Sequence, residues 1–404
     1  MSLLEGIKVV EVAIYAFVPS TGAALADWGA DVVKVEHPET GDPMRGLSSY
    51  GISPGMGGVT ALWEVFNRGK RSVGIDIASE AGRELLLKLV DEADVFLTNF
   101  MGPARKKLGI DVEDILARNP RIIYGRGTGQ GPVGPDADKG GFDALSYWGR
   151  PGVSTAAMPP DYDFPVMLPG PAFGDVQSGM NLAGGIAAAL YQRERTGKGA
   201  LVDVSLLSSG LWAMQATIAG AYVRGTDNIV QLDRYRPPNP LANIYKAKDG
   251  RFFLLGMLEA DRYWDKLCDV FGVGHLAQDS RFSSMGARAE HSEQLVALLD
   301  DVFSKMEMEE IARRLNSQEG QWSTIQMPRG AVDDVQSLEN GYIKVLDYDN
   351  GGKLPVVPVP ALVDGVIPAM RRAPEHGEHT DEILGSLGYS EDELVELKIS
   401  GAIS

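Results

Sequence analysis

Residues 7–36 read IKVVEVAIYAFVPSTGAALADWGADVVKVE, and three segments can be distinguished within them. Ile7–Val12 and Asp31–Glu36 are short apolar runs with the length of buried strands, and Pro19–Trp28 between them is typical of a short helix. Two strands connected through one helix form a βαβ unit, in which the strands are parallel. This region therefore predicts a parallel sheet with helices packed on it.

The same alternation continues along the chain to residue 126. Further strands are expected at Ser72–Ile77, Asp94–Phe100 and Ile122–Arg126, with an amphipathic helix at Ser79–Ala93. Repeated strand and helix segments are typical of an α/β fold with a doubly wound, Rossmann-like parallel sheet. Such sheets usually bind ligands beyond the carboxyl ends of their strands, so the segments that follow the strands are candidate binding segments.

The length of the chain and its turn signals indicate more than one domain. With 404 residues the chain exceeds one ordinary domain. Pro237–Pro240 is typical of a stiff linker, and Asp249-Gly250 between two apolar runs indicates a hairpin. We expect a large α/β domain whose N-terminal part is residues 1–225, a small α+β domain at 226–330, and a C-terminal segment, 331–404, that returns to the large domain.

Composition argues against several classes of function. A formal net charge of −17 argues against a nucleic-acid or anionic-membrane partner, because phosphate binding needs a dense basic face. We find no transmembrane stretch and no signal peptide at the N-terminus, so a cytoplasmic protein is expected. Cys268 is the only cysteine, which excludes a disulfide framework, and it is expected in the core. His376 and His379 lack a third ligand, so no metal is expected.

Asp175 is the residue that most directly indicates chemistry. It lies in PAFGDVQSGM, residues 171–180, a turn that leads into a helix expected at Val176–Arg195. The free N–H groups and the dipole of a helix start favour an anion by about 0.3–1 kcal/mol, so we expect the Asp175 carboxylate to be held ionised. An ionised carboxylate can attack an acyl group, although a carboxylate at this place can also act only as a helix cap.

Other enzyme classes find less support in their motifs. A nicotinamide dehydrogenase could use Glu36 to bind a ribose, but the turn after the first strand lacks the glycine fingerprint for a pyrophosphate. The Gly-x-Ser-x-Gly elbow of a hydrolase is also missing. Residues 125–141 are rich in glycine but lack the Gly-Lys-Ser/Thr sequence with which a P-loop ends. We expect them to be either a mobile surface loop or a lid over an acyl group.

Several short motifs together resemble the class III CoA-transferase family, which includes formyl-CoA transferase and carnitine CoA-transferase. Following the order of the family, they are GDPMRG at 41–46, NRGKRS at 67–72, Gly174-Asp175 with Ser178-Gly179-Met180, RTGKG at 195–199 and GEHT at 377–380. The resemblance extends from Gly6 to Gly388. It implies an enzyme that moves CoA from an acyl-CoA to a carboxylic acid through an aspartyl anhydride and an aspartyl-CoA thioester, with Asp175 as the nucleophile. It also implies an interlocked homodimer, with CoA as a substrate and no tightly bound cofactor.

The resemblance leaves two alternatives open. The related α-methylacyl-CoA racemases move an α-proton with an aspartate and with a histidine in a Gly-His-Asp segment. The matching segment here is Gly141-Phe142-Asp143, and phenylalanine cannot take a proton. Glu259 lies in a segment that resembles the one supplying the racemases' glutamate. A racemase-like isomerase and a CoA-binding relative without catalytic activity remain the alternatives to a transferase.

The resemblance also indicates the residues of the site. For CoA it points to His37, Ile75, Ala78, Asn99, Phe100 and Lys107. Because CoA is anionic and the chain is acidic, the cations Arg45 and Lys139 are further candidates. For the acyl pocket it points to Ile14, Tyr15, Ala16, Phe17, Phe142 and Glu259. The positions after the first strand are apolar here, where oxalate-handling relatives carry polar side chains. Burying apolar acyl surface is favourable at about 25 cal/mol per Å², so a bulky, branched or aromatic acid is expected as the acceptor.

Overall fold

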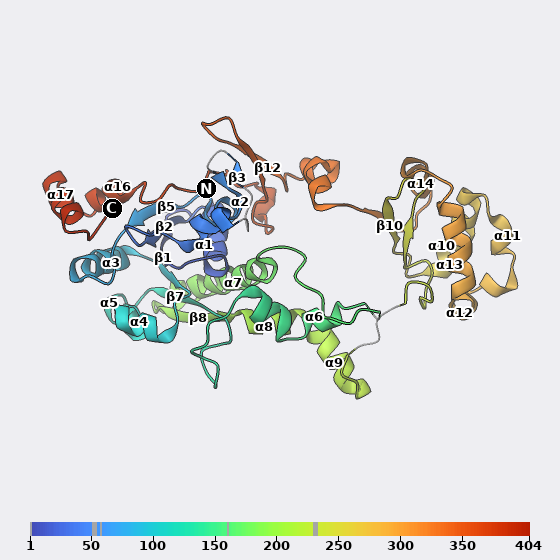
Figure 1. Cartoon of the computed structure of the whole chain (residues 1–404), viewed down its shortest axis with the longest axis horizontal. Helices are drawn as coiled ribbons and strands as arrows, with labels where there is room; N and C mark the ends of the chain where they lie inside the picture. The colour runs from blue at the N-terminus through green and yellow to red at the C-terminus, as the bar shows by residue number, and fades with distance from the viewer. Residues whose placement is uncertain (1, 51–54, 57–58, 160, 229–232) are drawn as a thin grey trace. The chain divides into compact units, whose positions relative to one another are not determined.

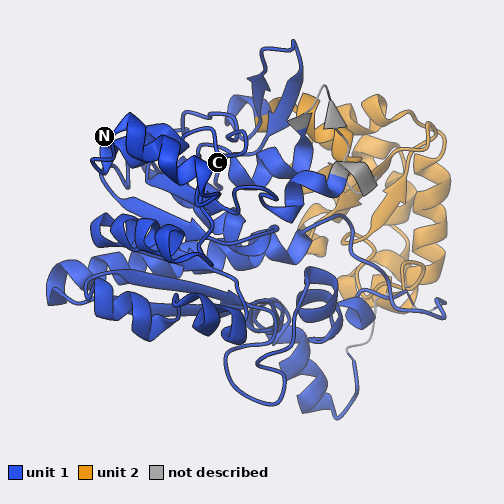
Figure 2. Ribbon diagram, turned by 60° about the vertical axis from the view of Figure 1, so that its left-hand side comes forward, with its two compact units in different colours: residues 1–229, 338–404 blue, residues 230–337 orange. Residues whose placement is uncertain are grey.

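The computed structural model describes residues 2–50, 55–56, 59–159, 161–228 and 233–404. The chain forms two compact units, one made of residues 1–229 and 338–404 and the other of residues 230–337 (Figure 2). Across the described residues, no helix combines the length and the apolar composition that crossing a bilayer requires.

A six-stranded parallel sheet forms the centre of the first unit (Figure 1). Its strands are β1 (Lys8–Val12), β2 (Asp31–Glu36), β5 (Arg71–Gly74), β6 (Val95–Thr98), β7 (Ile123–Thr128) and β8 (Ala200–Ser205). They are arranged in the order β5-β2-β1-β6-β7-β8, and every neighbouring pair is parallel. Counted along the chain this is the order 3-2-1-4-5-6 of doubly wound folds, which reverses direction between β1 and β6. The expected α/β parallel sheet is confirmed.

Helices cover both faces of this sheet. Successive residues of a strand point to opposite faces, so each strand contributes to two separate hydrophobic clusters. On one face Val9 and Val32 pack with α1 (Phe17–Asp27) and α7 (Phe173–Thr196). On the other face Val10 and Val33 pack with α3 (Glu80–Glu92), α5 (Val112–Arg118) and α16 (Thr380–Ser386). The C-terminal segment thus belongs to the core of the first unit.

Helices α1 and α7 approach each other closely at Gly179. A Cβ atom on Gly179 would lie 1.9 Å from Ser20 Oγ, so no larger residue fits there without movement. Thr21 Oγ1 donates to the carbonyl of Gly179 (3.1 Å), and Ser20 Oγ donates to the carbonyl of Asp175 (3.3 Å). These contacts hold the first turns of the two helices beside each other.

The first unit contains further short elements. They are η1 (Pro43–Tyr50), β3 (Gly55–Met56), β4 (Val59–Thr60), α2 (Ala61–Asn67), α4 (Gly102–Leu108), the π-helix η2 (Ala144–Gly149), α6 (Val153–Ala156), α8 (Leu206–Ala213), α9 (Gln215–Arg224), β12 (Lys344–Asp347), β13 (Lys353–Val356), η5 (Val363–Gly365) and α17 (Glu391–Ile399). Helix α15 (Val335–Glu339) spans the end of the second unit in sequence.

The second unit is a three-stranded antiparallel sheet packed with helices. Its elements are β9 (Ile244–Lys246), β10 (Phe252–Leu255), α10 (Ala260–Phe271), α11 (Gly274–Ala277), η3 (Ser280–Phe282), α12 (Met285–Glu290), α13 (Ser292–Phe303), α14 (Met308–Leu315), β11 (Trp322–Ile325) and η4 (Pro328–Asp333). The predicted hairpin at Asp249-Gly250 is confirmed, since β9 and β10 pair on either side of it. Cys268 is buried in the core of this unit, as expected.

Candidate active site

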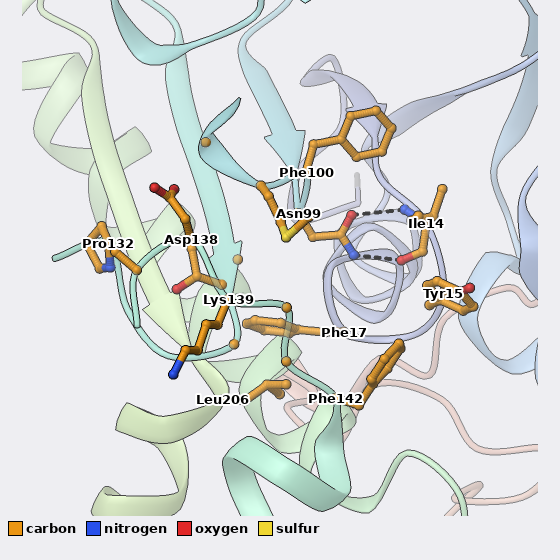
Figure 3. A pocket seen from close by; sticks show the side chains of 18 of the residues that line it. Ile14, Tyr15, Phe17, Asn99, Phe100, Pro132, Asp138, Lys139, Phe142 and Leu206 are labelled. Atoms are coloured by element: carbon orange, nitrogen blue, oxygen red, sulfur yellow. Dashed lines mark hydrogen bonds between the residues drawn. The ribbon is translucent and has the colours of Figure 1, made fainter. Parts of the chain in front are cut away.

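A cavity of about 280 Å³ lies beyond the carboxyl ends of β1, β6 and β7 (Figure 3). Its wall includes residues 14–17 after β1, residues 99–102 after β6, and parts of the segment 127–142 that follows β7. Asp175, in the first turn of α7, and Leu206, at the start of α8, complete the lining. The cavity is therefore at the reversal of strand order, where doubly wound sheets bind their ligands.

Helix α7 begins at Phe173, three residues earlier than the sequence pattern predicts. Ala172 has left-handed backbone angles (φ 59°) and turns the chain into the helix, so Asp175 is the third helical residue. Gly174 before it is buried, and a Cβ atom there would lie 2.2 Å from Tyr147 Cγ and 2.5 Å from Asp143 Oδ1. Only glycine fits at this position, and the packing of Gly174 fixes where Asp175 starts.

Asp143, and not Asp175, accepts a hydrogen bond from the start of α7. Its Oδ2 accepts the N–H of Gly174 (2.8 Å). Burial, and then the negative charge of Asp143, raise the pKa of Asp175 to about 7. The expectation that the helix start holds Asp175 ionised is therefore wrong, because burial disfavours the anion and a second carboxylate lies close to it. Asp175 is half-buried and titrates near neutral pH.

The candidate acyl residues after β1 lie together in the wall of this cavity. Ile14, Tyr15, Ala16 and Phe17 all line it, and Phe142 lines it from the segment after β7. Figure 3 shows the rings of Tyr15 and Phe142 next to each other; they pack edge to face, with centroids 5.8 Å apart. Glu259 belongs to the second unit, where its carboxylate pairs with Arg262 (3.4 Å). Its place in the pocket stays a prediction.

A second cavity of about 270 Å³ lies at the carboxyl ends of β2 and β5. It shares Ile14 and Phe100 with the first cavity, so the two adjoin. Among the candidate CoA residues, His37, Ile75 and Ala78 line the second cavity. Asn99 and Lys139 line the first, and Phe100 lines both.

Two candidate CoA residues, Arg45 and Lys107, line neither cavity. The guanidinium of Arg45 binds both carboxylate oxygens of Glu36 (2.8 Å each) and lies 3.6 Å from the ring centroid of Trp63. Although burial acts in the opposite direction, the Arg45 hydrogen bond lowers the pKa of Glu36 to about 2. The charge of Arg45 is thus largely compensated inside the unit. Lys107 is exposed on α4.

The glycine-rich segment after β7 forms a wall of the first cavity. Its ends meet at Gly129 and Gly141, where a Cβ atom on either residue would lie 2.6 Å from the Cα atom of the other. Asp136 of this segment pairs with Lys139 of the same segment (2.6 Å) and with Arg150, which directly follows η2 (2.7 Å). The backbone contact and the ion pairs close the segment into a loop over the cavity.

Comparison with known proteins identifies the family. The sequence pattern of CoA-transferase family III matches residues 4–380. The chain belongs to this family. It is 34% identical over 403 residues to (R)-2-hydroxy-4-methylpentanoate CoA-transferase of Clostridioides difficile, covering 99% of each chain. It is 29% identical to cinnamoyl-CoA:phenyllactate CoA-transferase of Clostridium sporogenes, covering 98% of this chain and 96% of the relative.

A solved structure gives the same assignment. The crystal structure of a CAIB/BAIF family protein from Brucella suis matches with a TM-score of 0.84 and 30% identity, covering 96% of this chain and 99% of that chain. The resemblance drawn from the sequence motifs is therefore confirmed. The protein is an enzyme, a class III CoA-transferase.

Two charged residues, Asp143 beside Asp175 and Arg105 in the cavity wall, were not selected as site residues from the sequence. Asp143 caps α7 from 31 residues away, a contact that no local spacing indicates. Arg105 lines the first cavity and is buried, with Nε 2.9 Å from Asp111 Oδ1. It belongs to the run Arg105-Lys106-Lys107, and only the orientation of α4 shows which of the three cations is turned inward.

The two histidines near the C-terminus bind backbone groups. His376 Nε2 lies 2.9 Å from the carbonyl of His37, and His379 Nδ1 accepts the N–H of Ser72 (3.3 Å). Within the described ranges, no group of three or more His, Cys, Asp or Glu side chains is arranged to hold a metal ion. Both histidines thus have contacts that tie the C-terminal segment to the sheet.

Proposed function

We propose that this transferase passes CoA from an acyl-CoA donor to a branched or aromatic carboxylic acid through covalent intermediates on Asp175. The observation that carries the proposal is the Asp175 carboxylate, half-buried in the wall of a cavity with apolar side chains at the switch point of the sheet. Asp138 lines the same cavity but is exposed, on the loop after β7. Asp175 is the better nucleophile because its position is fixed by the buried Gly174 and its pKa of about 7 leaves a reactive anion at neutral pH.

Four steps complete the transfer. An Asp175 oxygen attacks the thioester carbon of the donor, the C–S bond breaks, and CoA thiolate leaves a mixed anhydride behind. The thiolate then attacks the Asp175 carbonyl carbon, which releases the donor acid and forms the aspartyl-CoA thioester. The acceptor carboxylate attacks this thioester to give a second anhydride and CoA thiolate. Attack of the thiolate on the acceptor's acyl carbon forms the new acyl-CoA and restores the Asp175 carboxylate.

The start of α1 supports these steps. The helix begins at Phe17, and Ala16 and Phe17 both line the cavity. The first N–H groups of a helix have no carbonyl partner within it. At this place they favour the oxyanion that develops at each attacked carbonyl.

The two adjoining cavities suit the two ends of CoA. We infer that the nucleotide end occupies the second cavity, beside His37, Ile75 and Ala78, and that the thiol end passes Ile14 and Phe100 to reach Asp175. On this assignment the side chains near Asp175 contact the acyl group, while CoA affinity depends mainly on the second cavity.

The cavity wall and the relatives both favour a bulky acid. The side chains of Ile14, Phe17 and Phe142 are apolar or aromatic and offer few polar partners to a small dicarboxylate. The two relatives described above are named for a branched acid, (R)-2-hydroxy-4-methylpentanoate, and for an aromatic acid, phenyllactate. An acyl chain of either type would bury apolar surface against this wall.

Incubating the enzyme with an acyl-CoA donor and acids of increasing size tests this function. Succinyl-CoA, acetyl-CoA and an aromatic acyl-CoA serve as donors, and mass spectrometry identifies the new CoA thioesters. We expect branched and aromatic acids to exceed oxalate and formate in kcat/KM by roughly 10–200-fold, the scale of one methylene or ring edge in a pocket. Phe17→Ala should change the preferred acid and leave the affinity for CoA unchanged.

Two results would count against this assignment. One is oxalate accepted as readily as bulky acids, and the other is a Phe17→Ala variant that loses CoA affinity but keeps its acid preference. The same incubation in heavy water covers the racemase alternative. Because Phe142 stands where the racemases have a histidine, no deuterium should enter the α-carbon at the rate of turnover.

We also propose that the enzyme acts as a homodimer. Exposed apolar side chains are concentrated on α8 and α9, namely those of Leu211, Trp212, Ile218, Tyr222 and Val223. Tyr222 and Val223 are 87% and 83% exposed in the single chain. Apolar surface of this kind marks protein contacts. Sedimentation should give twice the mass of one chain, and a monomer at micromolar concentration would contradict the dimer.

A further inference from the structure

The backbone at Tyr15 is in a conformation that its surroundings must hold. Tyr15 lines the first cavity and has left-handed backbone angles (φ 64°). Residues other than glycine rarely adopt them, because the Cβ atom crowds the neighbouring carbonyl. On one side of Tyr15, the Asn99 side chain accepts the N–H of Ile14 (3.0 Å) and donates to the carbonyl of Ile14 (2.6 Å) (Figure 3).

Asp42 supplies the contact to Tyr15 itself. Its Oδ1 accepts the N–H of Tyr15 (3.1 Å) and the N–H of Met44 (2.9 Å). Its Oδ2 lies 2.9 Å from Lys34 Nζ. Asp42 is only 1% exposed, so its carboxylate is shared between an ion pair and two backbone groups away from water.

Lys34 is fully buried and connects Asp42 to Ala13, the residue that follows β1. Its Nζ donates to the carbonyl of Ala13 (2.8 Å) and lies 3.2 Å from Glu11 Oε1. Apolar residues of the same volume often stabilise a core as well as a buried ion pair does, so stability alone does not account for these charges. Their common effect is to fix the backbone from Ala13 to Tyr15.

We propose that Asp42 is a positioning residue that sets the acid specificity of the transferase. By binding the N–H of Tyr15 it holds the left-handed turn, and the turn presents the Tyr15 ring to Phe142, with centroids 5.8 Å apart and ring planes at 81°. This aromatic pair forms the wall against which the acyl chain lies. The inference rests on the proposed function, since it takes the first cavity as the acyl site.

The test compares Asp42→Ala with Asp42→Asn in the full chain. The readout is the ratio of kcat/KM for an aromatic acid to kcat/KM for a short straight-chain acid, measured with one acyl-CoA donor so that changes in CoA affinity cancel. Asp42→Ala should lower this ratio by about tenfold or more. Asp42→Asn keeps an oxygen that accepts both N–H groups, so its ratio should stay within about threefold of the wild type.

Asp27→Ala is the matched control. Asp27 is at the other end of α1, its side chain is 4% exposed, it pairs with Arg68 (2.7 Å), and it accepts the N–H of Val359 (2.9 Å). Like Asp42 it is a buried carboxylate with an ion pair and a backbone N–H as partners, but among the described residues no hydrogen bond or ion pair joins it to residues 13–15. Its loss should lower thermal stability and leave the ratio unchanged. An equal change of the ratio in Asp27→Ala, or no change in Asp42→Ala, would overturn the proposal.

Tyr15→Gly keeps the inference testable if Asp42→Ala does not fold. Glycine adopts the left-handed conformation without strain and removes the ring, so this variant should fold and show the same lowered ratio. Adding Asp42→Ala to Tyr15→Gly should then change the ratio little further, because both act through one ring. If Tyr15→Gly has the wild-type ratio and still transfers CoA to acids, the inference is overturned and the proposed function is not. A different result would contradict the proposed function: wild-type enzyme that transfers CoA to none of the acids. That result would overturn the proposed function and the inference together.

Discussion

Replacing Asp175 with asparagine or alanine is expected to abolish CoA transfer, lowering kcat by several orders of magnitude. An amide or a methyl group cannot attack a thioester, so neither intermediate forms. In the part of the chain that the structure describes, no hydrogen bond holds the Asp175 side chain, so folding and CoA binding should remain. Steady-state transfer and CoA titration measure the two effects separately. Turnover near that of the wild type in either variant would remove Asp175 from the mechanism.

Asp143→Asn is the matched control for the Asp175 variants. It changes the neighbouring carboxylate to an amide but keeps an oxygen that accepts the N–H of Gly174, so transfer should continue with a changed pH dependence. Transfer needs ionised Asp175, so wild-type activity should fall as the pH decreases below about 7, the pKa of this group. Removing the negative charge of Asp143 favours the anion and lowers the pKa of Asp175. The acid limb of the pH profile should therefore move to lower pH. Burial is the larger cause of the raised pKa, so the shift should be partial.

Gly174→Ala is expected to have the second largest effect. A Cβ atom there would lie 2.2 Å from Tyr147 Cγ and 2.5 Å from Asp143 Oδ1, so the start of α7 must move. Overpacking of this kind costs about 1–3 kcal/mol of unfolding free energy. Displacing a catalytic group by about 1 Å can cost a hundredfold in rate, so kcat should fall by about that factor. Thermal unfolding and transfer kinetics measure both losses.

Gly184→Ala provides the control for Gly174→Ala in the same helix. No atom lies within 4 Å of a Cβ placed on Gly184, and the residue is exposed. Alanine has a higher helix propensity than glycine by about 1 kcal/mol, so this variant should be as stable as the wild type or more stable, with normal activity. Equal behaviour of the two variants would show that α7 tolerates any added methyl group and that the packing of Gly174 does not position Asp175.

The parts of the fold that were predicted correctly are those whose signal is local. The runs at 7–12 and 31–36 correspond to β1 and β2, because segments rich in valine that are buried on both faces favour strands. The charged residues Glu11 and Lys34 within these runs are buried and pair with each other. The position of the turn after β1, at the carboxyl end of a parallel strand, predicts a ligand-binding segment, and Tyr15 and Phe17 of this turn do line the cavity. Phe142 joins them there, although it is distant in sequence.

The parts that were missed depend on contacts between distant residues. The start of α7 and the pKa of Asp175 both depend on Asp143, which the spacing within residues 171–180 does not include. For Arg45, a predicted CoA contact that stays a prediction, the sequence does not show that its guanidinium pairs with Glu36 and stacks on Trp63. A sequence shows which residues carry charge. Which charges are compensated inside the fold depends on tertiary packing.

The most direct test of the account is to trap the intermediate on Asp175. The enzyme is incubated with an acyl-CoA donor, quenched with hydroxylamine or borohydride during turnover, digested, and the peptide that contains residues 171–180 is sequenced by mass spectrometry. We expect a modification on Asp175 that requires acyl-CoA and is missing in Asp175→Asn. An unmodified Asp175 peptide in an enzyme that is turning over, or a modification on Asp138 instead, would contradict it.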